Sequence, residues 1–447
     1  MKHGSLVTAI SGIFVGTSMA CANVPPSSAA LPTDASAFAC CTTEGKAIAS
    51  RYRNTAISQR RFTHAELWTA LEPVTKSSAV RVTDIGRSIQ GRPIRAITFG
   101  HGPTTVLLWS QMHGDESTAT MALTDLLGWM TAPTPEVAAL RTRIADALTV
   151  VMVPMLNPDG AELFQRENAV GVDVNRDAAR LATPEARTLK ALRDSIKPAF
   201  GFNLHDQNGR ILSGRAGKQV AIALLAPARN DAADYEGARA NARLVASGLV
   251  SIIEREIPGR VAKYEDAFNP RAFGDLMQAW GTSTVLIESG ALPDDPQKQK
   301  LREINVIGIL SALQAIATER YRSADPRVYD NLAMNDRAAV DLMVKGAQVV
   351  LPGIEPMQVD LALNYGDLLN KLRPQVREVG DLSLVVAFDT LDARGLFLHP
   401  APAMLTEDKG MRWLRIGATG SFTLRRTRDP NSEIVRTIGD AVGPRRP

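Results

Sequence analysis

Four short runs of apolar residues constrain the fold of this chain more than any other feature. They span residues 105–109, 148–154, 199–204 and 283–287. Mostly apolar runs of this length are typical of strands that are buried on both faces of a parallel sheet. Stretches with helical character lie between them, such as 117–129 and 232–256. Strands that alternate with helices predict an α/β fold, with a mixed, mostly parallel sheet and helices on both of its faces.

Two local patterns precede the first of these runs. Residues 80–88 and 92–100 alternate between apolar and polar side chains on either side of Gln90-Gly91, which predicts a β-hairpin. Further upstream, Thr63 is followed three residues later by Glu66, the pattern of a capping box at the start of a helix.

The pattern of apolar and turn-forming residues changes after residue 323. Short β-like runs there are separated by Gly, Pro, Asn and Asp, and no chemical motif stands among them. We therefore expect four parts, which are a signal peptide at 1–22, a flexible linker at 23–45, an α/β domain at 46–323 and a smaller, mostly-β accessory domain at 324–447.

The N-terminus predicts export. A weakly basic start is followed by a small, apolar stretch at 6–20, which is too short to span a membrane, and Ala20-Cys21-Ala22 fits a signal-peptidase site. The mature protein is then expected in the periplasm or medium, with no stable membrane span. Two alternatives stay open, a retained membrane anchor and a lipoprotein that carries its lipid on Cys21.

Charge and cysteine content exclude several classes of protein. The net charge is only +4 over 447 residues, and the arginines near the C-terminus are not interleaved with aromatic residues, so nucleic acid is not an expected partner. The chain has three cysteines, Cys21, Cys40 and Cys41, and all precede the α/β domain. Neither a disulfide framework nor a cysteine-based metal site is therefore expected.

Two of the six histidines follow buried runs. His113 and Glu116 form an H-x-x-E motif after the run at 105–109, and His205 follows the run at 199–204. An isolated H-x-x-E is more often a surface pair. Open α/β sheets, however, place their sites at the carboxyl ends of strands, where these three side chains would meet. Two imidazoles and one carboxylate form a catalytic zinc set with a position left for water.

Glu288 is the fourth residue of interest. It directly follows the run at 283–287, again at a strand end. A glutamate against apolar residues can hold a raised pKa and carry a proton. The alternative is a glutamate that caps a helix or forms a salt bridge.

The stretch between the two histidines carries further polar motifs. It contains N-P-D-G at 157–160, then Arg166, then G-V-D-V-N-R at 171–176. Two arginines and an asparagine near a zinc site indicate capture of an anion. The alternatives are an ordinary turn at 157–160 and surface arginines.

Taken in order, these motifs resemble the M14 zinc carboxypeptidase family, in a bacterial, exported subgroup. The hairpin motifs I-G-R-S at 85–88 and G-R-P-I at 91–94 resemble the opening segment of that family, so the likeness covers about residues 80–290. It implies a zinc carboxypeptidase-like fold and a metallopeptidase that uses one zinc ion per chain to hydrolyse a C-terminal peptide bond.

The resemblance also implies roles for eight residues. His113, Glu116 and His205 would be the zinc ligands, and Glu288 would be the general base and acid. Arg166 would stabilise the oxyanion, and Asn175 and Arg176 would hold the terminal carboxylate of the substrate. Asp173 would be the carboxylate that orients a zinc-bound histidine.

Two departures from the family pattern leave the substrate open. The segment from Arg166 to Arg176 is short, and the family's substrate-capping tyrosine has no clear counterpart. Its place falls near Ala267 or Phe268, while Tyr264 lies slightly upstream. The expected substrate is a peptide or a peptidoglycan stem peptide. Two alternatives are a zinc-dependent deacylase that acts on acyl amino acids or stem peptides, and a binding module without activity.

Overall fold

The computed structural model of the protein describes residues 42–214, 217–367 and 371–439. These residues belong to the second of two compact units, which comprises residues 33–447. The expected signal peptide, residues 23–41 of the expected linker and all three cysteines lie outside the described residues. Within the described ranges, no helix combines the length and apolar character that crossing a membrane requires.

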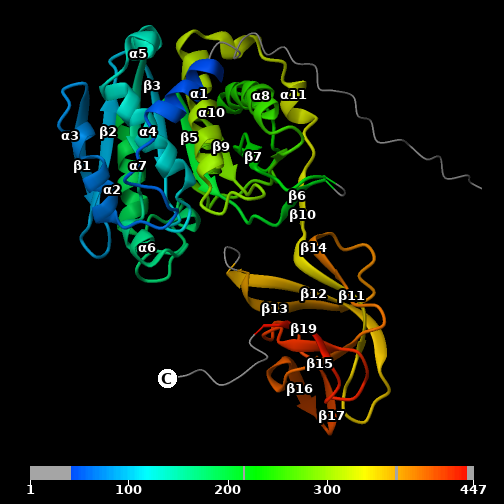
Figure 1. The fold of residues 1–447 in the computed structure, drawn as a ribbon. Helices are drawn as coiled ribbons and strands as arrows, with labels where there is room; N and C mark the ends of the chain where they lie inside the picture. The colour runs from blue at the N-terminus through cyan, green and yellow to red at the C-terminus, as the bar shows by residue number, and fades with distance from the viewer. Residues whose placement is uncertain (1–41, 215–216, 368–370, 440–447) are drawn as a thin grey trace, which may run out of the picture. The chain divides into compact units, whose positions relative to one another are not determined.

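An eight-stranded sheet forms the centre of the α/β domain (Figure 1), and its strand order is β1-β2-β4-β3-β5-β9-β7-β8. The strands are β1 Val80–Arg87, β2 Pro93–Phe99, β3 Thr104–Ser110, β4 Leu148–Val153, β5 Phe200–Asp206, β7 Ile222–Leu225, β8 Val261–Lys263 and β9 Ser283–Ser289. Neighbours within β4-β3-β5-β9 are parallel, whereas β2 pairs antiparallel with β4 and β7 with β9. The predicted mixed, mostly parallel sheet is therefore confirmed.

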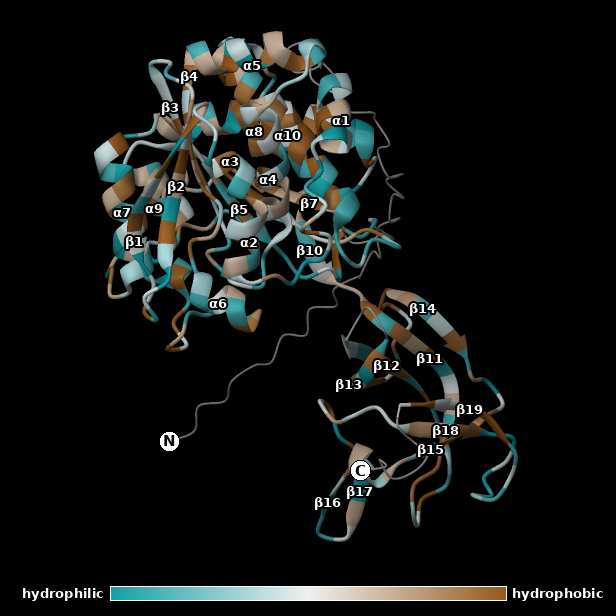
Figure 2. Ribbon diagram, turned by 60° about the vertical axis from the view of Figure 1, so that its left-hand side comes forward, coloured by the Kyte–Doolittle hydropathy of each residue, from teal (hydrophilic) through white to brown (hydrophobic). Residues whose placement is uncertain are grey.

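Each of the four apolar runs forms a central strand, because its side chains are buried on both faces of the sheet. On β3, Leu107 and Trp109 join a core with α7 and α9, and the alternate residues Val106 and Leu108 are equally buried on the opposite face. That second face packs against α4 and α8, which α10 joins. The central strands accordingly appear mostly brown in the hydropathy colouring of Figure 2.

Helices connect the strands. They are α1 Thr42–Arg51, α2 His64–Ala70, α3 Glu72–Thr75, α4 Thr118–Thr131, α5 Pro135–Ala147, α6 Pro158–Leu163, α7 Pro184–Ile196, α8 Ala238–Glu256, α9 Phe273–Ala279, α10 Gln299–Ala317, α11 Arg327–Asp330 and the short 3-10 helix η3 Val174–Arg176. The helix expected at 232–256 begins only at Ala238. Asp234 accepts hydrogen bonds from Arg229 and Asn230 and holds a loop, and Gly237 then takes a φ of 55°.

The two local patterns at the start of the domain have the predicted structures. Strands β1 and β2 form an antiparallel hairpin. Thr63 caps α2, and a full capping box joins its side chain and backbone to Glu66.

The C-terminal residues form β-rich sheets, as the predicted mostly-β character requires. The larger sheet has the order β13-β12-β11-β15-β18-β19, with β14 beside β11, and its own apolar core. The strands are β11 Val340–Val349, β12 Met357–Asp367, β13 Leu372–Gly380, β14 Ala387–Asp392, β15 Phe397–Pro400, β18 Phe422–Arg425 and β19 Ile434–Ile438, with a hairpin of β16 Leu405–Asp408 and β17 Met411–Leu414. Before this sheet, β10 (Asn335–Ala338) pairs with β6 (Ile211–Ser213).

Candidate metal centre and surrounding cavity

The sheet brings three of the predicted residues to one edge. His113 and Glu116 lie in the loop between β3 and α4, and His205 is the penultimate residue of β5. On the neighbouring strand β9, Glu288 is the register partner of His205. Since these strands are parallel, their carboxyl ends meet at this edge of the sheet.

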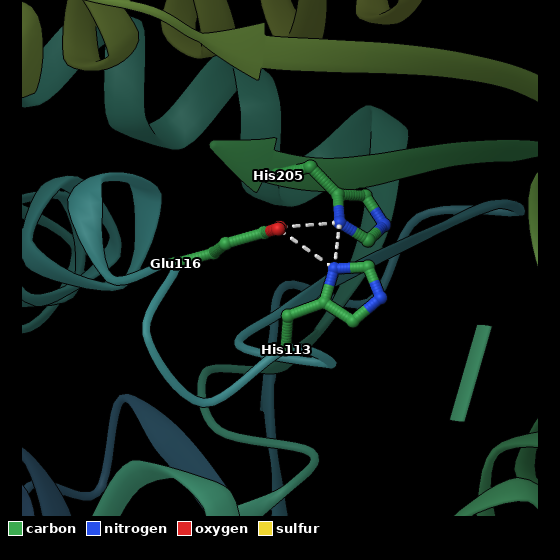
Figure 3. Close-up of side chains that lie close together, drawn as sticks. All are labelled: His113, Glu116 and His205. Carbon is green, nitrogen blue, oxygen red and sulfur yellow. Dashed lines mark hydrogen bonds and ion pairs between the residues drawn. The ribbon is translucent and has the colours of Figure 1, made fainter. Parts of the chain in front are cut away.

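The side chains of His113, Glu116 and His205 converge on one point (Figure 3). Glu116 Oε1 lies 2.8 Å from His113 Nδ1, and Glu116 Oε2 lies 2.6 Å from His205 Nδ1. The two Nδ1 atoms are 3.1 Å apart. In the described part of the chain, these three residues form the group of donor atoms, all within 4.8 Å of one another, that could hold a metal ion.

The N-P-D-G motif supports the loop that carries two of these residues. Asn157 caps α6 by accepting from the Gly160 N–H, and its side-chain amide donates to Met112 O, next to His113. Gly114 packs directly on this turn, where an added Cβ would lie 2.0 Å from the backbone carbon of Gly160. The glycine of H-G-x-E is therefore required by close packing, and the motif is more than a surface turn.

The same motif also fixes the hairpin turn. Asp159 accepts hydrogen bonds from Ser88 Oγ at 2.7 Å, Gln90 N at 2.9 Å and Arg92 Nη1 at 2.6 Å. One buried carboxylate thus joins the turn of β1 and β2 to the start of α6.

Asp173 and Arg166 contact the trio formed by His113, Glu116 and His205. Asp173 Oδ1 lies 3.0 Å from His113 Nε2, so that the imidazole presents Nδ1 to Glu116 and His205. Arg166 donates to Asp173 Oδ2 through Nε and Nη2, at 3.1 and 2.9 Å, and its Nη1 lies 3.2 Å from Glu116 Oε1. The guanidinium is thereby held at the edge of the trio.

The electrostatics of the trio favour a cation. Burial lowers the pKa of His113, but the carboxylates of Glu116 and Asp173 outweigh it and raise that pKa to about 9. Burial likewise opposes ionisation of Glu116, yet the neighbouring imidazoles hold its pKa below the ordinary value. Two imidazole nitrogens and an ionised carboxylate suit a zinc ion, and the three residues would hold it.

The pKa of Glu288 is shifted in the opposite direction from that of Glu116. Burial and the negative charge of Glu116 raise the pKa of Glu288 well above its usual range. Its Oε2 is buried and has no hydrogen-bond partner among the described residues. A protonatable oxygen is therefore free to interact with a group in the cavity.

A cavity of about 530 Å³ opens over the trio. Arg166, Asn175, Arg176 and Glu288 line it, so all of the predicted substrate-contacting residues reach one space. Asn175 accepts from Phe273 N at 2.9 Å, which fixes its amide, while Arg176 forms no salt bridge within the described ranges. A guanidinium that lines a cavity and forms no salt bridge with the described residues is suited to bind a carboxylate.

Tyr264, which follows β8, also lines the cavity, as does Ala267. Burial, followed by the charge of Glu288, raises the pKa of Tyr264 to about 12, so its hydroxyl stays protonated. The structure thus places a tyrosine in this cavity a few residues before the position at which the family pattern predicts one.

Several residues of the site carry no signal in the sequence. Asp206 accepts from Thr118 Oγ1 at 2.6 Å and from Lys298 Nζ at 2.9 Å. Lys298 is only 5% exposed, and burial lowers its pKa. Arg60 and Asp275 line the cavity as well.

Comparison with known proteins gives a partial match. The sequence model of the family described as zinc carboxypeptidase, M14, matches residues 69–202. Carboxypeptidase 2 of Trichophyton rubrum is 31% identical over 101 residues, and carboxypeptidase SOL1 of Arabidopsis thaliana is 30% identical over 123 residues. These matches cover 22% and 26% of this chain, but only 18% and 25% of the relatives' own lengths.

Two solved structures are similar at low identity. A metallo-carboxypeptidase from Pseudomonas aeruginosa has a TM-score of 0.46 and 16% identity, over 59% of this chain and 70% of its own. A metallo-carboxypeptidase from Burkholderia cenocepacia has a TM-score of 0.45 and 16% identity, over 56% and 69%. Over residues 69–202, this chain is therefore similar to the M14 family of zinc carboxypeptidases.

Proposed function

We propose that the protein is an exported zinc metallocarboxypeptidase, which hydrolyses the amide bond before the C-terminal residue of a peptide. The observation that supports it best is the meeting of the His113, Glu116 and His205 donor atoms beside Glu288, whose Oε2 is buried and unpaired. A ligand trio beside a carboxyl group of raised pKa suits hydrolysis of an unactivated bond.

A bound zinc ion would supply Lewis acidity, which makes water a stronger nucleophile and polarises a carbonyl group. Side chains of the protein carry out the remaining catalytic roles. Glu288 Oε2 takes the proton of the attacking water and returns it to the leaving amine. Arg166 donates hydrogen bonds to the oxygen on which negative charge develops. Asp173, through its contact with His113 Nε2, keeps the imidazole oriented with Nδ1 toward Glu116 and His205.

Arg176 is the basis for proposing which end of the substrate is held in the cavity. Arg176 has no salt-bridge partner among the described residues and lines the cavity with Asn175. We assign the terminal carboxylate to these two residues, which makes the enzyme an exopeptidase. We assign Tyr264, which lines the same cavity, to the same end of the substrate.

The experiment is product analysis with a matched variant. The purified zinc-loaded protein is incubated with peptides of varied C-terminal residue, cell-wall stem peptides and N-acyl amino acids, and mass spectrometry identifies what is released. Loss of single C-terminal residues, abolished by a chelator, is expected. Glu288→Gln should keep zinc but lose about 10²- to 10⁴-fold in kcat. Turnover of N-acyl amino acids alone would favour a deacylase, and near-normal activity of Glu288→Gln would refute the assigned base.

Export is tested separately. N-terminal sequencing of the protein isolated from its source should find a start near Asn23. A lipid on Cys21, or an intact Met1, would replace the proposed processing with one of its alternatives.

A further inference from the structure

A buried lysine lies next to the metal centre and takes no part in the proposed catalytic steps. Lys298 is 5% exposed, and its Nζ donates to Asp206 Oδ2 and to Ser289 O, each at 2.9 Å. An ammonium group that is withdrawn from water loses its solvation, so these two bonds must compensate for that loss. Lys298 is not among the residues that line the cavity, and a substrate bound there is therefore not its partner.

The two groups that Lys298 contacts belong to the last residues of neighbouring strands. Asp206 ends β5, Ser289 ends β9, and the two residues are register partners. Each directly follows a residue of the site, because Asp206 comes after His205 and Ser289 comes after Glu288. A single ammonium group therefore joins the strand end that carries a proposed metal ligand to the strand end that carries the proposed base.

The carboxylate of Asp206 extends this connection to the loop that carries Glu116. Asp206 Oδ2 also accepts from Thr118 Oγ1 at 2.6 Å, and Thr118 begins α4 two residues after Glu116. The Asp206 N–H donates to Glu116 Oε2 at 3.1 Å. Asp206 Oδ1 is buried and has no hydrogen-bond partner among the described residues, so the donors to Oδ2 orient this carboxylate. Without Lys298, the donors left near Oδ2 are Thr118 and, at 3.7 Å, Arg60 Nη2.

The backbone of Lys298 is held in a conformation that residues other than glycine seldom adopt. Its φ of 53° and ψ of 32° lie in the left-handed region, immediately before α10. Asp295 fixes this turn, because its carbonyl accepts from the Lys298 N–H and its carboxylate accepts from the next three N–H groups, those of Gln299, Lys300 and Leu301. Strained residues of this kind persist where the placement of a side chain matters to a site.

We propose that Lys298 is a positioning residue of the metal centre. By joining the ends of β5 and β9, its ammonium group fixes His205 relative to Glu288, and through Asp206 it also fixes the loop of Glu116. The role towards Glu288 rests on the proposed function, in which Glu288 is the base. The role towards His205 and Glu116 requires only that these residues bind a metal ion.

Two readouts separate positioning from the neutralisation of a buried charge. The visible absorption bands of the cobalt(II)-loaded protein report the geometry of the ligands without requiring turnover, and kcat of the zinc-loaded protein reports the placement of Glu288. Lys298→Met should shift the cobalt bands and lower kcat about 10- to 100-fold, the effect typical of groups that orient a metal ligand, with KM nearly unchanged. Lys300→Met is the matched control, because Lys300 is an exposed lysine in the first turn of α10 and should change neither readout.

A double variant keeps the test decisive, because Lys298→Met alone leaves the buried carboxylate of Asp206 without its cation. Lys298→Met combined with Asp206→Asn removes both charges and keeps an acceptor for Thr118. This double variant should regain thermal stability, while its cobalt bands stay shifted and its kcat stays low. If it regains the wild-type bands and kcat together with its stability, Lys298 only neutralises Asp206 and the positioning role is overturned.

The two readouts also distinguish failure of this role from failure of the proposed function. If the cobalt bands shift in both variants but the wild-type protein releases no C-terminal residue from any peptide, the proposed function fails and the positioning of the ligands stands. If the wild-type protein cleaves peptides and both variants match it in bands and in kcat, the positioning role fails and the proposed function stands.

Discussion

Asp275, buried in the wall of the cavity, destabilises the folded protein at neutral pH. It is 8% exposed and lies in the first turn of α9, where its Oδ1 accepts one hydrogen bond from Asn269 N. Burial outweighs that bond and raises the pKa of Asp275 from 3.8 to about 6. Ionising this carboxyl group therefore costs more in the folded protein than in the unfolded chain.

Replacement with asparagine removes this cost and keeps the acceptor oxygen. At roughly 1.4 kcal/mol per pKa unit, the shift corresponds to about 3 kcal/mol of added stability for Asp275→Asn at pH 8. Because the group is ionised above its folded pKa, the gain should fall to about half at pH 5. It should vanish below about pH 4, where both states are protonated.

Thermal unfolding of the metal-free protein at pH 8 and pH 5 measures the effect. A gain of about 3 kcal/mol should raise the Tm of Asp275→Asn by roughly 5 to 10 °C at pH 8, and by less at pH 5. Asp231→Asn is the control, since Asp231 is exposed and should change neither value. A gain of equal size at both pH values, or none at pH 8, would refute the electrostatic reasoning.

Three further perturbations have defined outcomes. Zinc at a thousandfold excess over its Kd should stabilise the protein by about 4 kcal/mol in thermal unfolding, and His113→Ala should abolish that increment. Arg302→Met leaves the buried carboxylate of Asp125 unpaired, so denaturant unfolding should show a loss of about 3 to 5 kcal/mol, most of which Asp125→Leu should restore. Gly114→Ala should cost about 3 kcal/mol or more, because its Cβ would overlap Gly160, and a smaller loss would contradict that packing.

The central strands were predictable because a short, mostly apolar run has few other places in a compact α/β domain. The position of a residue at the end of a strand was equally informative about the site. The carboxyl ends of parallel strands meet at one edge of a sheet, so residues far apart in the chain come together there. His205 and Glu288 are separated by more than eighty residues, yet they are register partners. The strand-end rule therefore predicted a meeting that no local motif contains.

The supporting groups could not be predicted, because nothing local distinguishes them. Lys298 contacts Asp206 across 92 residues and takes a φ of 53° at the start of α10. Arg60 belongs to an irregular segment with no periodicity. The start of α8 was wrong for a related reason, since local side-chain bonds to Asp234 compete with the helix that the alanine-rich sequence favours.

The residues that surround the cavity differ in the backbone dynamics expected of them, because some lie on inner strands and others on connecting segments. His205 and Glu288 lie on adjacent inner strands, whose amide hydrogens should exchange with solvent only when the whole domain opens. Arg60, Arg166 and Tyr264 lie on connecting segments, which open locally at lower cost. Substitutions in those segments can therefore reshape the cavity, while His205 and Glu288 keep their register on the sheet.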